Sequence, residues 1–204
     1  MSARPGSICR MAIDIAGFIT YVKDHAIEHG FHVHDERHFI ETFSLRQSFE
    51  VDLHPESACD GPLDLNLAFD VEPRVLLRLE DWVKVHEDEI TEAADNFQLP
   101  IYFNWALPTM KSPPDLVVLA AELAGIGGFD LPIEVSGVES TGAISTHADM
   151  RLSLVGRVEM SLVDVMMGQE QLCDILDRCR EVSEYLVTAS EQWEVEYPPP
   201  LPPE

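Results

Sequence analysis

The clearest periodic pattern in the chain lies between Asp149 and Ala189, where strand and helix signals stand side by side. Residues 148–155 and 158–165 alternate apolar and polar side chains, and Gly156-Arg157 between them has the composition of a tight turn, which predicts a hairpin. After Gly168, apolar residues recur every three or four positions and predict an amphipathic helix. Its apolar stripe consists of Leu172, Ile175, Leu176, Cys179, Val182, Leu186 and Val187.

A weaker version of the same pattern lies nearer the N-terminus. Residues 63–69 alternate as a strand, residues 70–74 have turn composition, and residues 75–83 continue as a second strand. A polar helix is predicted at 87–97. Further helices are predicted at 14–30 and 115–125, beginning at the capping residues Asp14 and Asp115, and further extended segments at 31–34, 44–54, 101–105 and 131–138.

These elements predict an α+β fold with a mostly antiparallel sheet, or two such sheets, and helices packed on one face. The repeated order suggests two related halves, residues 11–108 and 109–190, each running helix, strand, hairpin, helix. The alternative is that packing alone repeats such elements, without a duplication. We expect residues 1–10 to be a flexible arm, and the acidic, proline-rich residues 191–204 to be a disordered tail.

The chain is strongly acidic, with 13 Lys and Arg against 37 Asp and Glu and a formal net charge of -24. Such a field repels nucleic acid and anionic lipid, so we expect neither as a partner. It favours metal ions or basic proteins. The alternative is that the acidity serves solubility alone.

The number of cysteines and the length of the apolar runs indicate where in the cell the protein would be found. Cys9, Cys59, Cys173 and Cys179 are too few and too scattered for a disulfide framework. No apolar run reaches the roughly 18 residues of a membrane span, and the N-terminal residues lack a signal-peptide core. These observations predict a soluble, cytoplasmic protein.

The densest group of chemically active side chains is a histidine cluster. On a helix His25 and His29 share one side, and on an extended segment His32 and His34 share one face. With nearby carboxylates they would suit zinc, nickel or iron, so the candidate metal ligands are His25, His29, His32, His34 and His38. The alternatives are ordinary surface and helix-cap histidines, or a pH-sensitive patch.

Two tryptophans are candidate anchors for a protein partner. Trp82 lies near a predicted strand end, and Trp193 follows the last predicted helix. Core packing is the competing interpretation for both. The glycine-rich stretch 125–128 follows a helix rather than preceding one, so it does not predict a phosphate site.

No catalytic residues are predicted, because no catalytic motif appears. The first functional hypothesis is therefore a non-catalytic protein-binding module, an adaptor or chaperone for a basic client, and a homodimer. The second is a metal-dependent hydrolase that uses the histidine cluster with Glu28 or Asp35. The third is an acidic mimic of nucleic acid, which would need carboxylates at phosphate-like spacing.

Overall fold

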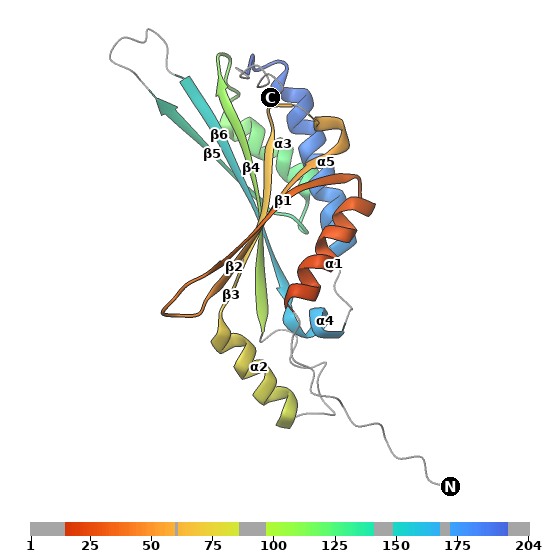
Figure 1. Cartoon of the computed structure of the whole chain (residues 1–204). Helices are drawn as coiled ribbons and strands as arrows, with labels where there is room; N and C mark the ends of the chain where they lie inside the picture. Colours follow the sequence, from red (N-terminus) through yellow and green to blue (C-terminus); the bar gives the residue numbers. More distant parts are fainter. Residues whose placement is uncertain (1–14, 60, 86–96, 141–148, 168–171, 196–204) are drawn as a thin grey trace, which may run out of the picture.

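The computed structural model describes residues 15–59, 61–85, 97–140, 149–167 and 172–195 (Figure 1). The described elements are α1 (Ile15–Glu28), β1 (Phe31–Ile40), β2 (Gln47–Pro55), the 3-10 helix η1 (Glu56–Ala58), β3 (Asp64–Val71), α2 (Pro73–Val85), β4 (Gln98–Met110), α3 (Leu116–Gly127), β5 (Ile133–Ser140), β6 (Asp149–Ser161), α4 (Leu162–Met167) and α5 (Leu172–Ser190).

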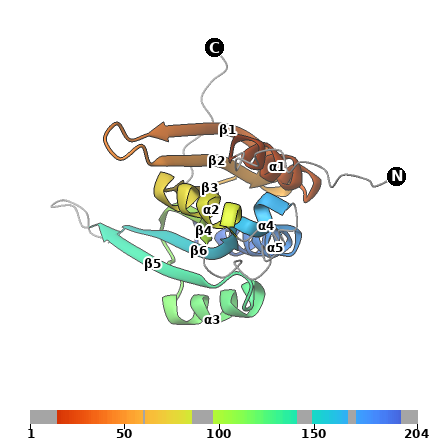
Figure 2. The same ribbon diagram turned by 90° about the horizontal axis from the view of Figure 1, so that it is seen from below.

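The strands form one antiparallel sheet in the order β1-β2-β3-β4-β6-β5, so β1 and β5 are its edges. The long helix α5 and α1 lie along one face, and α3 packs against β5 and α5 (Figure 1). Viewed from below, the turn between β1 and β2 projects away from these helices (Figure 2). The predicted α+β class, with one continuous sheet and helices on one face, is confirmed. A duplication is not shown.

The core lies between the sheet and α1, α3 and α5. Strands β2, β3 and β4 alternate buried and less buried residues along their length, as a sheet with one covered face requires. The predicted stripe of α5 is confirmed, since all its members are buried except Val187, which is half-buried. Each large side chain buried in this way contributes about 1.5–3 kcal/mol to folding. Trp105 lies at the centre, and its Nε1 donates to Ser183 Oγ at 2.9 Å.

The hairpin predicted at 148–165 is wrong, because β6 is one continuous strand that pairs with β4 on one side and β5 on the other. Gly156 does not turn the chain. A Cβ atom at this position would lie 2.8 Å from Leu131 Cδ1 and 3.1 Å from Trp105 Cζ3. Glycine inside a strand marks such a close approach of a neighbour, and this explains the misleading turn signal.

The second strand predicted at 75–83 is also wrong, because these residues belong to the helix α2. Pro73 stands at the first helical position, where its fixed φ angle is suited and its missing N–H costs nothing. Val75, Leu76, Leu79 and Trp82 then follow helical rather than alternating spacing, and Leu79 is fully buried.

The other predicted helices that fall within the described residues are confirmed. Helix α1 ends at Glu28, and Gly30 follows it with φ 81°. The side chain of Asp115 caps α3 by accepting from the backbone N–H groups of Val117 and Val118 at 2.8 and 3.2 Å. This helix continues past its predicted end at Gly125, to Gly127.

The predicted extended segments are confirmed, although their bounds differ and two of these four are longer than expected. Residues 31–34 begin β1, residues 44–54 overlap β2, residues 101–105 lie inside β4, and residues 131–138 overlap β5. The helix predicted at 87–97 falls almost entirely on 86–96, outside the described residues. The N-terminal arm at 1–10 also lies outside them.

The predicted boundaries between segments need correction. The boundary at 108/109 falls inside β4, in the middle of the sheet. The tail was predicted to begin at 191, yet Trp193 is only 8% exposed and Val195 forms a bridge with Met110. Trp193 and Val195 therefore pack against the core, and 196–204 lie outside the described part. Among the helices that are described, none has the length and apolar character needed to cross a membrane.

Candidate metal centre

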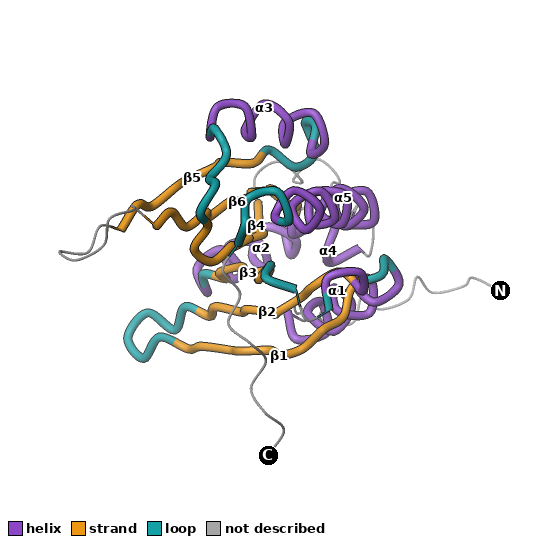
Figure 3. The backbone as a smooth tube through the Cα atoms, turned by 90° about the horizontal axis from the view of Figure 1, so that it is seen from above, coloured by secondary structure: helices purple, strands orange, loops and turns teal. Residues whose placement is uncertain are grey.

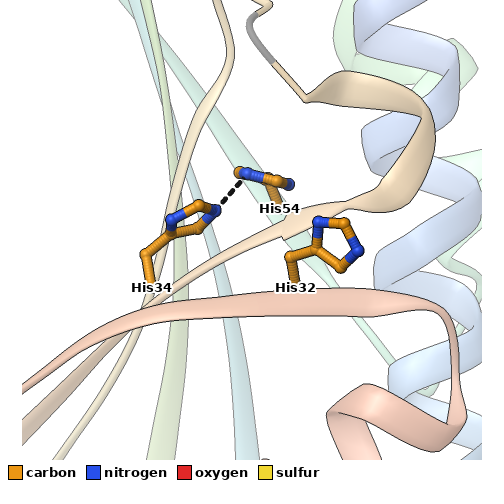
Figure 4. Close-up of side chains that lie close together, drawn as sticks. All are labelled: His32, His34 and His54. Carbon is orange, nitrogen blue, oxygen red and sulfur yellow. Dashed lines mark hydrogen bonds between the residues drawn. The ribbon is translucent and has the colours of Figure 1, made fainter.

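Three histidines from two paired strands come together at one end of the β1–β2 hairpin (Figure 4). They are His32 and His34 on β1 and His54 on β2, and one ligand atom from each lies within 4.8 Å of the others. His32 and His34 were predicted as metal ligands. The structure brings them together with His54, which was not.

The strand register explains this convergence. His32 pairs directly with His54, so the two side chains leave the same face of the hairpin. The register then shifts between Val33 and Asp35, and His34 is the extra residue. A bulge of this kind re-aims a side chain. His34 also shares a face with His32, two residues before it on the strand, and His34 Nε2 makes a short contact with His54 Nε2 (Figure 4).

Two further donors lie beside the imidazoles, both just after β2. Cys59 Sγ is 3.1 Å from His32 Nδ1 and 3.9 Å from His54 Nδ1. Glu56 Oε1 is 3.8 Å from His32 Nε2. The Cys59 thiol is not in a disulfide and is exposed, and the side chains of His32 and His34 are exposed as well. An ion in solution can therefore reach the cluster.

The nearest large carboxylate cluster is already engaged by an arginine. Arg37 donates to both carboxylate oxygens of Asp52 at 2.7 Å and to Glu50 at 3.1 Å, and Asn66 donates to Asp52 at 2.9 Å. The hydrogen bond from Arg37 holds the pKa of Asp52 below its usual value, although partial burial opposes this. Asp35, a candidate partner in the hydrolase hypothesis, also contacts Arg37, at 3.3 Å. The donors beside the three imidazoles are thus the Cys59 thiol and the Glu56 carboxylate, while Asp35, Glu50 and Asp52 are paired with Arg37.

The remaining predicted ligands lie elsewhere. His29 Nδ1 is 2.8 Å from Asp177 Oδ1 on α5. The ring of His25 packs on Tyr21, with ring centres 4.0 Å apart. His38 Nε2 is 3.1 Å from Gln47 Oε1, and its ring stacks on Phe49. The structure joins each of these histidines to other partners, and the single cluster of five does not form.

His54 and Cys59 were missed because they are distant from the histidine cluster in sequence. The available signal was strand pairing: residues 31–34 and 44–54 were both predicted to be extended. An antiparallel hairpin between them would set His32 opposite His54, as the structure does. Cys59 follows in the loop that leaves the second strand.

The candidate partner-binding tryptophans lie in different surroundings. Trp193 is buried in the core, which fits the packing interpretation. Trp82 is half-buried on α2, and its ring centre is 6.4 Å from that of Phe97. The most exposed large apolar side chain in the β1–β2 turn is Phe43, at 99%, and it is accompanied on this hairpin by the exposed Phe39, Ile40 and Leu45.

Comparison with known proteins gives no relative: no family model matches the chain, and no similar curated protein or solved structure is found.

Proposed function

We propose that the chain binds a divalent transition-metal ion, of the zinc class, through His32, His34 and His54. The convergence of the three ligand atoms within 4.8 Å of one another carries the proposal. Around zinc, with Zn–N bonds of about 2.0–2.1 Å, tetrahedral geometry separates two ligand nitrogens by about 3.3 Å. Small rotations of exposed rings bring the cluster to that spacing.

The backbone that carries the ligands supports the proposal. His32 and His54 face each other across paired strands, and His34 lies on the same face as His32 because it is two residues further along the strand. The hairpin therefore presents a preformed arrangement, and binding needs little ordering of the chain.

The donor set and the charge of the chain favour particular ions. Neutral imidazoles suit zinc, nickel and iron better than calcium or magnesium, which prefer oxygen ligands. A net charge of -24 raises the concentration of cations near the surface and speeds their arrival. The field acts on every cation, so the imidazoles provide the selectivity.

Zinc-dependent stabilisation of the folded chain tests this proposal. We expect saturating zinc, at about a hundred times the dissociation constant, to add about 2.7 kcal/mol to the stability of the metal-free protein. For a chain of this size that is a rise of about 5–10 °C in the melting temperature. The measurement is a thermal melt with and without zinc, after removal of metal by a chelator.

The matched variants are His54→Ala and His38→Ala, which change histidines of the same hairpin. His38 contacts Gln47 and Phe49 rather than the cluster. We expect the zinc-induced rise to be lost in H54A and kept in H38A, whatever either substitution does to the metal-free melt. A wild-type melt insensitive to zinc, or an equal rise in both variants, would contradict the proposal.

A second candidate function, a non-catalytic module that binds a basic protein, is favoured by the apolar turn of the β1–β2 hairpin. Phe39, Ile40, Phe43 and Leu45 are exposed on an edge strand and its turn, and this turn points away from the helices (Figure 3). Exposed apolar groups gathered in this way are typical of interaction sites. The acidic charge of the chain would attract a basic client.

Suppression of aggregation tests this second function. We expect the protein to lower the light scattering of a basic client protein unfolded by reduction, and Phe43→Ser to weaken that effect severalfold. The control is Val117→Ser, which removes another exposed apolar side chain, from α3. Equal activity of the two variants would argue against the hairpin, and no suppression by the wild type would argue against a chaperone.

A further inference from the structure

Cys59 lies beside two of the three histidines of the proposed metal site. Tetrahedral zinc, with Zn–S near 2.3 Å, separates a thiolate sulfur from an imidazole nitrogen by about 3.6 Å. Cys59 Sγ lies 3.1 Å from His32 Nδ1, close to that value, and 3.9 Å from His54 Nδ1. The thiol is therefore the side chain best placed to join the three imidazoles on one ion.

The segment that carries Cys59 is held in place by its own contacts. Glu56, the first residue of η1, donates its backbone N–H to Gly30 O at 3.0 Å, just before β1. Ala58 is buried, and its carbonyl accepts from Gly61 N at 2.9 Å. A Cβ at Gly61 would lie 3.0 Å from that carbonyl oxygen, so the turn is tight. The position of Cys59 is thus fixed relative to β1 and β2.

The outer nitrogen of His54 has a partner that orients the ring. His54 Nδ1 is 3.2 Å from Pro55 O, and it can donate there while Nε2 faces His34. His32 Nδ1 faces Cys59, and its Nε2 lies 3.8 Å from Glu56 Oε1, beyond hydrogen-bond distance. Metal-binding histidines commonly donate their second N–H to a carbonyl or carboxylate in this way.

We propose that Cys59 is the fourth protein ligand, so that His32, His34, His54 and Cys59 form a closed tetrahedral site. This inference rests on the proposed metal site. On binding, the Cys59 S–H bond breaks, a sulfur–metal bond forms, and the proton passes to solvent. The three imidazoles bind as neutral ligands.

A three-histidine site is compatible with either a catalytic or a structural metal ion, whereas a closed site is compatible only with the second. A hydrolytic zinc keeps one position free for water, whereas a structural or regulatory zinc has all four filled by protein. The fourth ligand therefore makes this site non-catalytic. The ion instead ties the loop after η1 to β1 and β2, next to the edge of the sheet.

Cobalt(II) substitution into the full-length, chelator-treated protein tests the inference. A thiolate ligand gives cobalt a charge-transfer absorption in the near ultraviolet that nitrogen ligands do not give. We expect this band in the wild type together with the strong visible absorption of tetrahedral cobalt. Cys59→Ser should lose the charge-transfer band, and Cys173→Ser, which changes an exposed cysteine of α5, should keep it.

The outcomes separate the two proposals. Cobalt bound without a charge-transfer band, or with a band that survives in C59S, would overturn the role of Cys59 and leave the three-histidine site standing. No cobalt binding by the wild type, checked by competition with zinc, would overturn both. A band lost in C59S alone supports the closed site.

Discussion

Trp105 occupies the centre of the core because its neighbours make room for it and satisfy its polar atom. Gly156 lies on the adjacent strand without a Cβ, and Ser183 on α5 accepts the indole N–H. The Ser183 hydroxyl in turn donates to Cys179 O at 2.8 Å. Satisfying a buried N–H avoids a cost of about 1–3 kcal/mol. The packing of one residue thus links β4, β6 and α5.

Replacement by alanine should change the stability in opposite directions at the crowded Gly156 and at the open Gly125. We expect Gly156→Ala to lower the free energy of unfolding by about 1–3 kcal/mol, because the new methyl group overlaps Trp105 and Leu131. Gly125→Ala, inside α3 with nothing within 4 Å of the new atom, should raise it by about 0.5–1 kcal/mol. Urea denaturation measures both. A neutral G156A would show that the sheet relaxes at this position.

At the scale of elements, α3 and α5 are joined at their surface by Tyr185 and Glu122. The Tyr185 hydroxyl donates to the Glu122 carboxylate. Burial, and then this carboxylate, raise the pKa of Tyr185 to about 12. Because the pKa is higher in the folded state, the stabilisation is fully present below the unfolded value near 10 and is lost as pH rises through about 12.

A spectrophotometric titration of tyrosine ionisation checks this pKa, with Tyr185→Phe identifying the transition. We expect Glu122→Gln to lower the pKa of Tyr185 by removing a negative charge and a strong acceptor. The pKa should stay above its unfolded value, since burial is the larger cause. If E122Q leaves the transition unchanged, the two side chains are not paired in solution.

The sequence predicted those elements whose signals are local. The cap at Asp115 and the stripe of α5 depend only on neighbours in the chain, and both were read correctly. The turn predicted at Gly156 was wrong because this glycine makes room for Trp105, which is far away in sequence. The candidate site was predicted in part for the same reason: His32 and His34 are close in the chain, whereas His54 reaches them through strand pairing and Cys59 follows in the loop after β2.

At the scale of the whole molecule, the acidic charge and the proposed metal site differ in how they would hold a cation. A net charge of -24 holds a cloud of cations around the entire surface. Loosely held ions exchange with salt, because at about 0.15 M ionic strength exposed charges are screened beyond about 8 Å. An ion held by His32, His34 and His54 is bound by coordination instead, so it should survive removal of excess metal at that salt concentration.

The most direct test of the three-histidine site is the metal content of the full chain after loading with zinc and gel filtration at about 0.15 M salt. We expect about one zinc per chain in the wild type and in H38A, and nearly none when His32, His34 and His54 are all replaced by alanine. A wild-type chain that emerges without zinc, or a triple variant that retains as much as the wild type, would contradict the proposed site.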